Sequence, residues 1–386
     1  MRDKRCYLDY NATTPICEEA LEAFAQASRI HGNPSSVHLD GQSARHCLDA
    51  ARQELASVFG VQPQEIIFTS GATEANNLAI KGIARHAKAN HKKNHLLISA
   101  IEHPSVLDAA TALKAEGFEV EEFPVLANGR ADATALESRL RPETALVALM
   151  RVNNETGIVQ PTAEAAGICS KAGVPLHVDW VQGLGKLPVD LAGAASASFS
   201  AHKAYGPKGV GALVTARSTR LLAQAHGGPQ ENNLRAGTES PALASAFAAS
   251  VRTAERLRAE GAGRMMELRQ VFLKTLESCV RGWGINGDPE QALPQTVSLR
   301  VDGVDGSVLV RALDLAGVSV SSGSACAAGS IEPSYVLEAM GLDPAAVRSS
   351  VRVSFGHFTQ SDELIACAQI LGREAARLKT ASGSRS

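Results

Sequence analysis

Short apolar runs alternate with segments of helical spacing from about residue 60 to residue 215, and this alternation constrains the fold more than any other feature of the chain. The apolar runs predict strands over 66–69, 95–99, 118–123, 144–150, 174–178, 195–199 and 210–215. The segments between them predict helices over 73–88, 104–116, 132–140 and 161–172. Because the runs are continuously apolar and helices separate them, the pattern predicts an α/β fold with a mostly parallel sheet covered by helices.

The pattern changes after residue 240. A long helical stretch over about 241–280 is followed by a few strands, a helix near 306–316 and a last helix over about 360–378. We predict a large domain over 15–255. Residues 1–14 and 256–386 should form a smaller α+β domain, which carries a segment of small residues around Cys326, at about 321–330.

The composition excludes several classes of function. With 38 Lys+Arg against 40 Asp+Glu, the chain is close to neutral, so direct nucleic-acid binding is not expected. No apolar run approaches the roughly 18–20 residues that span a bilayer, and the first residues lack the apolar core of a signal peptide. The 7 cysteines form no Cys-x-x-Cys pair, which argues against a disulfide framework or a metal centre and favours a reducing cytoplasm.

A candidate phosphate site lies between the strand predicted at 66–69 and the helix that follows. Gly71 permits a tight turn, and the amides of Ala72 and Thr73 lie at the start of the helix, where free N–H groups bind phosphate. The alternative is ordinary helix capping by Ser70 or Thr73.

Two charged residues lie at the ends of neighbouring predicted strands. Asp179 could pair with a protonated ring nitrogen, or it could simply cap a helix. Lys203 is a candidate Schiff-base amine, although a lysine in a loop is usually a solvated side chain.

Cys326 lies among ten small residues, 321–330, which predict a mobile loop that could carry a reactive thiol to a substrate. The alternative is a buried cysteine in a tight turn. His86, His91 and His95 lie among basic residues, which indicates a solvated face rather than a metal site.

The order of these features is more informative than any one of them. A phosphate-binding helix start, a strand-end Asp and a strand-end Lys 24 residues later together indicate a site for pyridoxal 5′-phosphate. The phosphate would lie at the helix start, the ring nitrogen at Asp179 and the aldehyde at Lys203.

The chain also resembles the pyridoxal-phosphate cysteine desulfurases of the NifS/IscS type, within the class V aminotransferases. The segments that carry the resemblance are YLDYNATTP (7–15), GNPSSVH (32–38), EIIFTSGATEANNLAIKG (65–82), EHPSVL (102–107), NNETG (153–157), HVDWVQGLGKLPVDL (177–191), SAHKAYGPKGVGAL (200–213), HGGPQE (226–231), RAGTES (235–240), SSGSACAAGSIEPSYVL (321–337) and VRVSFGHFT (351–359). They span nearly the whole chain. The resemblance implies a fold-type I transferase that binds pyridoxal 5′-phosphate.

The resemblance also implies roles for individual residues. The implied catalytic residues are Lys203 as the Schiff-base lysine, Cys326 as the nucleophile and His103, which would stack on the ring and help to transfer protons. The implied cofactor-binding residues are Ala72, Thr73, Asn154, Asp179, Gln182, Ser200, Ala201, His202 and Thr238, of which Gln182 would bind the ring hydroxyl and Thr238 the phosphate of a partner subunit. Arg352 and Asn33 would clamp the substrate carboxylate.

The implied activity converts L-cysteine to L-alanine and transfers sulfur through a persulfide on Cys326, for iron–sulfur cluster assembly or other thiolation. The implied partners are a second copy of the chain and a sulfur acceptor such as an iron–sulfur scaffold. Trp180, Ala201, Ser240 and His357 depart from the residues common in the family. Because Trp180 and His357 could reshape the pocket, a selenocysteine lyase or a general carbon–sulfur lyase is an alternative. A catalytically silent binding protein is another.

Overall fold

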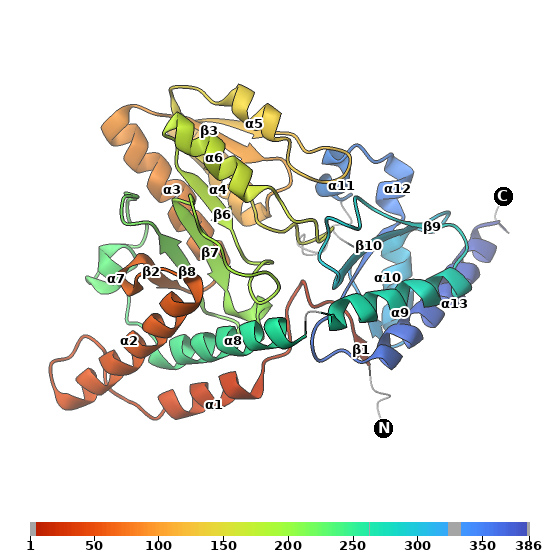
Figure 1. Cartoon of the computed structure of the whole chain (residues 1–386), viewed down its shortest axis with the longest axis horizontal. Coiled ribbons are helices and arrows are strands. Elements are labelled where there is room, and N and C mark those ends of the chain that lie inside the picture. The colour runs from red at the N-terminus through yellow and green to blue at the C-terminus, as the bar shows by residue number, and fades with distance from the viewer. Residues whose placement is uncertain (1–4, 262, 323–332, 384–386) are drawn as a thin grey trace.

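A seven-stranded sheet forms the centre of the larger part of the molecule (Figure 1). The computed structural model describes residues 5–261, 263–322 and 333–383. The strands follow the order β2-β8-β7-β6-β5-β3-β4, and β8 runs antiparallel to its two neighbours while the other pairs are parallel. Their bounds are β2 Ile66–Thr69, β3 His95–Ser99, β4 Glu119–Phe123, β5 Thr144–Ala148, β6 Leu176–Asp179, β7 Ser196–Ser200 and β8 Gly211–Thr215. The predicted strands and the mostly parallel sheet are confirmed.

Helices cover both faces of this sheet because successive strand residues point to opposite sides. Ile67, Leu96 and Ile98 pack beneath α3 (Ala72–His91) and α4 (Pro104–Ala112). Residues of alternate register, such as Phe68 and Leu97, belong to a second buried cluster. The helices that contribute to this second cluster include α1 (Glu18–Ala27), α2 (Leu39–Phe59), α6 (Thr162–Ala172) and α8 (Pro241–Glu260). The remaining elements of this part are α5 (Ala133–Arg139), α7 (Gln230–Asn233) and the 3-10 helices η1 (Pro63–Glu65), η2 (Leu113–Glu116) and η3 (Ala201–Lys203).

A third buried cluster forms the core of the smaller part. It is built around a three-stranded antiparallel sheet of order β12-β10-β9, with α9 and α13 packed against each other. The N-terminal strand β1 (Cys6–Tyr7) also belongs to this part, because it pairs with β11 (Val318–Ser319). The other bounds are α9 Arg264–Cys279, β9 Trp283–Ile285, β10 Thr296–Val301, α10 Gly306–Leu315, α11 Tyr335–Ala339, α12 Pro344–Arg348, β12 Ser350–Ser354 and α13 Ser361–Gly383.

The stretch predicted as one helix over 241–280 is two helices. α8 ends before Gly261, and α9 begins after Gly263. Each helix has an apolar face, so the apolar spacing continues across the break and does not reveal it. The two helices pack against different cores. We therefore propose that the boundary between the two domains lies near Gly261, a few residues after the position expected from the sequence.

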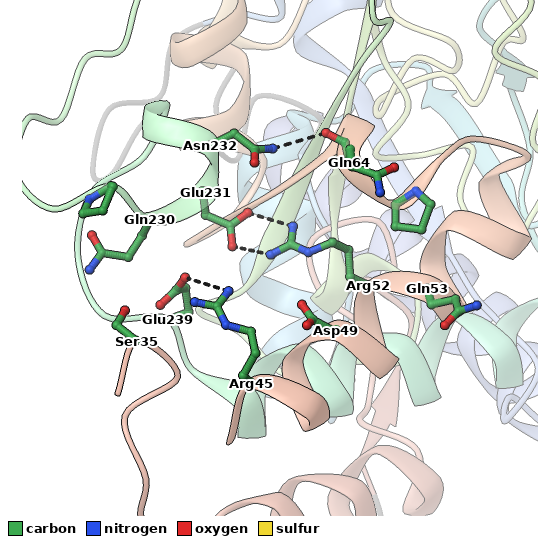
Figure 2. Close-up of a pocket in the computed structure, with 12 residues that line it drawn as sticks. Ser35, Arg45, Asp49, Arg52, Gln53, Gln64, Gln230, Glu231, Asn232 and Glu239 are labelled. Carbon is green, nitrogen blue, oxygen red and sulfur yellow. Dashed lines mark hydrogen bonds and ion pairs between the residues drawn. The ribbon is translucent and has the colours of Figure 1, made fainter. Parts of the chain in front are cut away.

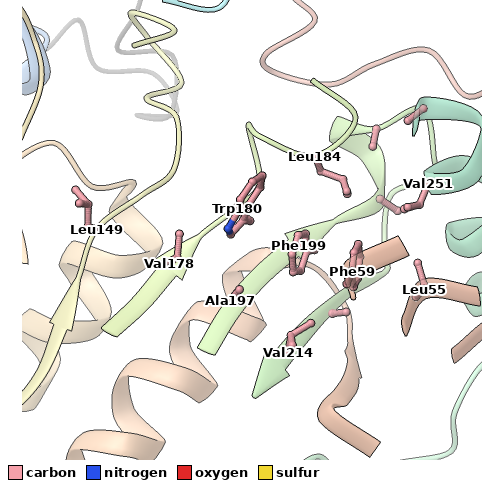
Figure 3. Packing of buried hydrophobic residues seen from close by; sticks show 14 of the residues in the cluster. Leu55, Phe59, Leu149, Val178, Trp180, Leu184, Ala197, Phe199, Val214 and Val251 are labelled. Carbon is pink, nitrogen blue, oxygen red and sulfur yellow. The ribbon is translucent and has the colours of Figure 1, made fainter. Parts of the chain in front are cut away.

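Trp180 points into the core of the large domain (Figure 3). Its ring is 1% exposed and lies 6.4 Å from the ring of Phe199, which in turn stacks on Phe59 at 4.2 Å. The guanidinium of Arg151 lies 5.5 Å from the Trp180 ring. The departure at position 180 is thus accommodated by core packing.

At Gly211, the backbone of β8 comes close to the backbone of the loop that precedes α3. Gly211 pairs with Thr69 on one side and with Ser200 on the other. A Cβ atom at this position would lie 2.8 Å from Cα of Gly71 and would also meet the carbonyl oxygen of Phe199. Only glycine lets the loop that opens α3 lie so close to β8.

We expect Gly211→Ala to lower the free energy of unfolding by about 1–3 kcal/mol, because backbone atoms must move to admit the methyl group. Gly167→Ala is the matched control. Gly167 lies inside α6 with open space around its Cα, so alanine should raise the free energy of unfolding by about 0.5–1 kcal/mol. Chemical denaturation of the two variants tests this, and equal stabilities would contradict the close packing of Gly211.

Candidate functional site

A cavity of about 520 Å³ opens at the carboxyl edge of the central sheet. The edge collects residues that follow β2, β3, β5, β6 and β7, since these strands run parallel and end on the same side. Ten residues singled out in the sequence line the cavity: Ala72, Thr73, His103, Asn154, Asp179, Gln182, Ser200, His202, Lys203 and Arg352. The fold therefore gathers most of the predicted site in one place.

The first turn of α3 faces this cavity. Gly71 is the N-cap of this 20-residue helix and makes no side-chain capping hydrogen bond. The capping role considered for Ser70 or Thr73 is therefore wrong. Ala72, Thr73, Ser200 and His202 all line the cavity, which therefore offers backbone amides and hydroxyl groups. This is the donor set that a phosphate group requires.

Asp179 ends β6 and is held by two N–H donors. Its Oδ1 accepts from the amide of Val181 at 2.9 Å, and its Oδ2 accepts from Nδ2 of Asn76 at 2.9 Å. Asn76 is fully buried, and its Oδ1 accepts from Nε2 of His177 at 2.9 Å. The carboxylate is thus fixed in orientation while it faces the cavity.

Burial keeps His177 neutral while it holds Asn76. Its Nε2–H donates to Asn76, so its Nδ1 accepts from the hydroxyl of Ser196 at 2.8 Å. Complete burial lowers the pKa of His177 to about 3. Protonation would place a charge in the core and break the bond from Ser196.

His103 is the N-cap of α4 and joins the same network. Its Nδ1 accepts from the amide of Ser105 at 3.1 Å, and since an amide can only donate, the proton of the neutral ring lies on Nε2. The hydroxyl of Ser105 lies 2.8 Å from both His103 Nδ1 and Asn76 Nδ2. Burial lowers the pKa of His103, although Asp179 opposes this shift.

Lys203 belongs to η3, directly after β7. Its Nζ donates to the carbonyl oxygens of Asn11 at 2.6 Å and Ala12 at 2.7 Å. The neighbouring His202 lies 3.2 Å from the Thr13 hydroxyl, and burial together with Lys203 and Lys208 lowers its pKa to about 4. The N-terminal segment therefore forms one wall beside the lysine.

Arg352 lies on β12 and reaches the cavity from the smaller domain. Its Nη2 is 2.6 Å from Oδ1 of Asp9, and its Nη1 donates to the carbonyl of Asn154 at 3.0 Å. Its Nε is buried without a partner among the residues that the structure describes, and the same holds for Oδ1 of Asn154. Both residues line the cavity, and a guanidinium suits a carboxylate.

Four other predicted residues do not line this cavity. Ala201 is buried behind it, with its amide bonded to Val210. Asn33 is exposed before α2, where its Oδ1 accepts from the amide of Ser35. Thr238 is exposed and lines a separate cavity of about 110 Å³. Cys326, with nearly all of the predicted 321–330 loop, lies outside the described residues. The roles of these four residues stay predictions.

Sequence reasoning did not single out Asn11, Asn76 and Lys186. Asn76 lies four residues after Ala72 on α3, and Lys186 lies four residues after Gln182. This spacing places side chains on one face of a helix or helical turn and could have drawn attention to both. No sequence feature indicated Asn11, whose contacts come from distant parts of the chain.

A larger polar cavity of about 590 Å³ is lined in part by Glu239, the residue that follows Thr238 (Figure 2). Arg52 and Glu231 form a two-point ion pair on its wall, at 2.5 and 2.8 Å. Glu239, next to Thr238, is buried, and its Oε2 has no hydrogen-bond partner in the described part of the chain. Glu231, Asn232 and Asn233 adopt φ values of 44°, 58° and 62°, a run of left-handed residues that is costly outside glycine.

The chain is similar to known proteins over nearly its whole length. The sequence profile of the family described as aminotransferase class-V matches residues 6–366. A cysteine desulfurase IscS of Dictyoglomus turgidum is 38% identical over 382 residues, which cover 98% of this chain and 96% of that protein. A solved NifS-like protein superposes with a TM-score of 0.90 at 33% identity and covers 97% of this chain and 100% of its own. A structure titled SspA in complex with cysteine has a TM-score of 0.78 at 34% identity and covers 90% and 98%.

The neutral His177 predicts a specific loss of stability in acid. The unfolded chain binds a proton at this residue near pH 6.5, whereas the folded chain does so only near pH 3. As the pH falls from 6.5 to 4, His177 should therefore remove about 3 kcal/mol from the free energy of unfolding.

His177→Asn should flatten this part of the stability profile, even if the variant is less stable at pH 7. His91→Gln is the control, because His91 is exposed at the end of α3. Denaturation by urea between pH 7 and pH 4 measures the slopes. An unchanged slope in His177→Asn would show that this residue is not held neutral.

Proposed function

Because the chain belongs to the class V aminotransferase family, and within it to the cysteine desulfurases, we propose how its own residues divide the work of taking sulfur from L-cysteine. The chain is a pyridoxal-phosphate-dependent sulfurtransferase that forms L-alanine. The observation that carries the residue assignments is that Lys203, Asp179 and the first turn of α3 line one cavity. In chemical type and in order, they match the aldehyde, the ring nitrogen and the phosphate of that cofactor.

The residues around the cavity fit this group. The phosphate would be held by Ala72, Thr73, Ser200 and His202, the ring nitrogen by Asp179 and the ring hydroxyl by Gln182. Lys203 would hold the aldehyde carbon through Nζ, and the buried acceptor of Asn154 faces the same space. When bound, pyridoxal 5′-phosphate supplies an electron sink for the charge that develops on Cα of the substrate.

Arg352 would bind the carboxylate of L-cysteine. Its ion pair with Asp9 and its bond to the Asn154 carbonyl fix the plane of the guanidinium. The substrate carboxylate then meets a donor that is already oriented. Asn33, which is exposed before α2, would complete this clamp.

Two side chains would move the protons. Once the amine of Lys203 is released from the cofactor, it would lie next to the reacting carbon. Its Nζ would then remove the proton from Cα of the substrate. His103 is neutral and carries its proton on Nε2, so it can stack on the ring and still donate one hydrogen bond. Ser105 and Asn76 connect its ring to Asp179.

Cys326 would accept the sulfur. Its thiolate attacks the sulfur of L-cysteine, so that a sulfur–sulfur bond forms as the carbon–sulfur bond breaks. The electron pair of the broken bond stays on carbon and takes up a proton, which yields L-alanine. The enzyme keeps a persulfide on Cys326, and a second thiolate removes its outer sulfur.

A second copy of the chain would complete each site. Thr238 is exposed in its own chain and directly precedes Glu239, which lines the polar cavity and pairs with Arg45 (Figure 2). Val37, on the loop that carries Asn33, and Leu39, the first residue of α2, are 89% and 79% exposed. A partner subunit that covers these residues would bring its own Thr238 to the phosphate.

The sulfur acceptor we propose is an iron–sulfur scaffold protein or another protein that takes part in thiolation. A cytoplasmic location would suit a free catalytic thiol. In the described ranges of the chain, no helix is both long and apolar enough to cross a membrane.

Lys203→Ala should lower alanine formation from L-cysteine by about a thousandfold, because both the anchoring amine and the base are lost. Cys326→Ala should abolish the protein persulfide, which trapping with an alkylating reagent and mass spectrometry detects. Cys279→Ala is the control, because Cys279 is an exposed thiol outside the cavity. A Cys326→Ala enzyme that transfers sulfur at the full rate would overturn the role of Cys326.

Mixed dimers test the shared site. Lys203→Ala and Thr238→Asp chains should each be inactive alone, since the first lacks the amine and the second repels the phosphate. If Thr238 acts in the partner's site, a co-refolded mixture should regain up to about a quarter of the wild-type activity, from the one intact site of each mixed dimer. If Thr238 serves its own chain, the mixture stays inactive.

A further inference from the structure

Lys186 lies directly behind the cavity residue Gln182. Its Nζ is 2.5 Å from Oε1 of Gln182 and 3.5 Å from Oδ1 of Asn11. Both partners are neutral amide oxygens. Burial lowers the pKa of Lys186 to about 7, and the nearby cations Lys203 and Arg352 add to this effect. A desolvated ammonium near two other cations raises the free energy of the folded protein. A functional role would explain why a lysine is kept at this position.

Two one-way hydrogen bonds fix the amide of Gln182. A lysine ammonium can only donate, so the atom of Gln182 that faces it must be Oε1. A backbone carbonyl can only accept, and the carbonyl of Asn11 accepts from Nε2 of Gln182 at 2.8 Å. The amide therefore cannot flip, and its nitrogen keeps a second hydrogen for a ligand in the cavity that Gln182 lines.

The charge of Lys186 also changes the strength of this donor. A cation at Oε1 draws electrons from the amide and makes its N–H groups stronger donors. The titration of Lys186 does not remove the contact, because a neutral amine still donates a hydrogen. Only the polarising charge is lost.

We infer that Lys186 is a positioning residue that locks the Gln182 amide and strengthens its hydrogen bond to the ring oxygen of the cofactor. The inference rests on the role proposed for Gln182 in cofactor binding. Lys186 itself does not line the cavity within the described residues, so it acts through Gln182 rather than on the substrate.

The test follows the visible absorbance of the holoenzyme against pH, without substrate. Deprotonation of the lysine–cofactor linkage leaves negative charge on the ring oxygen, and a nearby cation favours that form. Lys186→Met removes the cation and the donor but keeps a chain of similar length, so the absorbance midpoint should rise by about 0.5–1 pH unit. Lys186→Arg should stay close to the wild type, because it keeps a charged donor. Lys171→Met, on the exposed end of α6, is the control and should show no shift.

A double-mutant cycle separates this role from a structural one. In a Gln182→Leu background, Lys186→Met should cause no further shift, because the residue through which Lys186 acts is gone. An unshifted midpoint in Lys186→Met, or an equal shift in both backgrounds, would overturn the inference. If Lys186→Met does not fold, Lys186→Gln keeps a donor without charge and should show a smaller rise. A colourless holoenzyme preparation would instead count against the proposed function.

Discussion

The backbone carbonyl of Asn11 is the point on which the site depends. It accepts hydrogen bonds from Nζ of Lys203 at 2.6 Å and from Nε2 of Gln182 at 2.8 Å. The side-chain Nδ2 of Asn11 donates to the carbonyl of Asn154 and to the hydroxyl of Thr296. Its backbone N–H donates to the hydroxyl of Ser354. One buried residue of the N-terminal segment thus joins the central sheet to β10 and β12 of the smaller domain. The relative position of Lys203 and Arg352 depends on this junction.

Buried polar groups fix the side chains at the sheet edge. Asn76, His177 and Ser198 are completely buried, and a buried polar group without a partner would cost several times what a satisfied one contributes. Each of these donors meets an acceptor, so the orientation of Asp179 depends partly on Asn76, His177 and Ser198, which do not line the cavity. The sensitivity to acid comes from the same source, because burial keeps His177 neutral.

Local patterns in the sequence predicted the sheet well. Short runs between helical segments revealed all seven strands, although β4 is rich in glutamate rather than apolar. Strand ends revealed Asp179 and Lys203, because parallel strands deliver their carboxyl ends to one edge. Two kinds of feature were not predicted. The break between α8 and α9 depends on which core each helix meets, and periodicity carries no information about the partner. Trp180 was expected to affect the pocket, but the alternation of side chains across the sheet sends it into the core opposite Phe199.

The cavity carries an excess of positively charged side chains. Lys203, Lys208 and Arg352 line the cavity, and Lys186 lies behind it, so positive charge gathers in a partly desolvated space. Mutual repulsion of this kind is offset only by anions, and a phosphate together with a substrate carboxylate supplies them. The carboxylates at the cavity already have partners: Asp9 is bound to Arg352, Glu74 to Arg235, and both oxygens of Asp179 accept N–H donors. Each anionic group of the bound molecules therefore has one cationic or amide-rich place to go, which sets the orientation of cofactor and substrate before any bond changes.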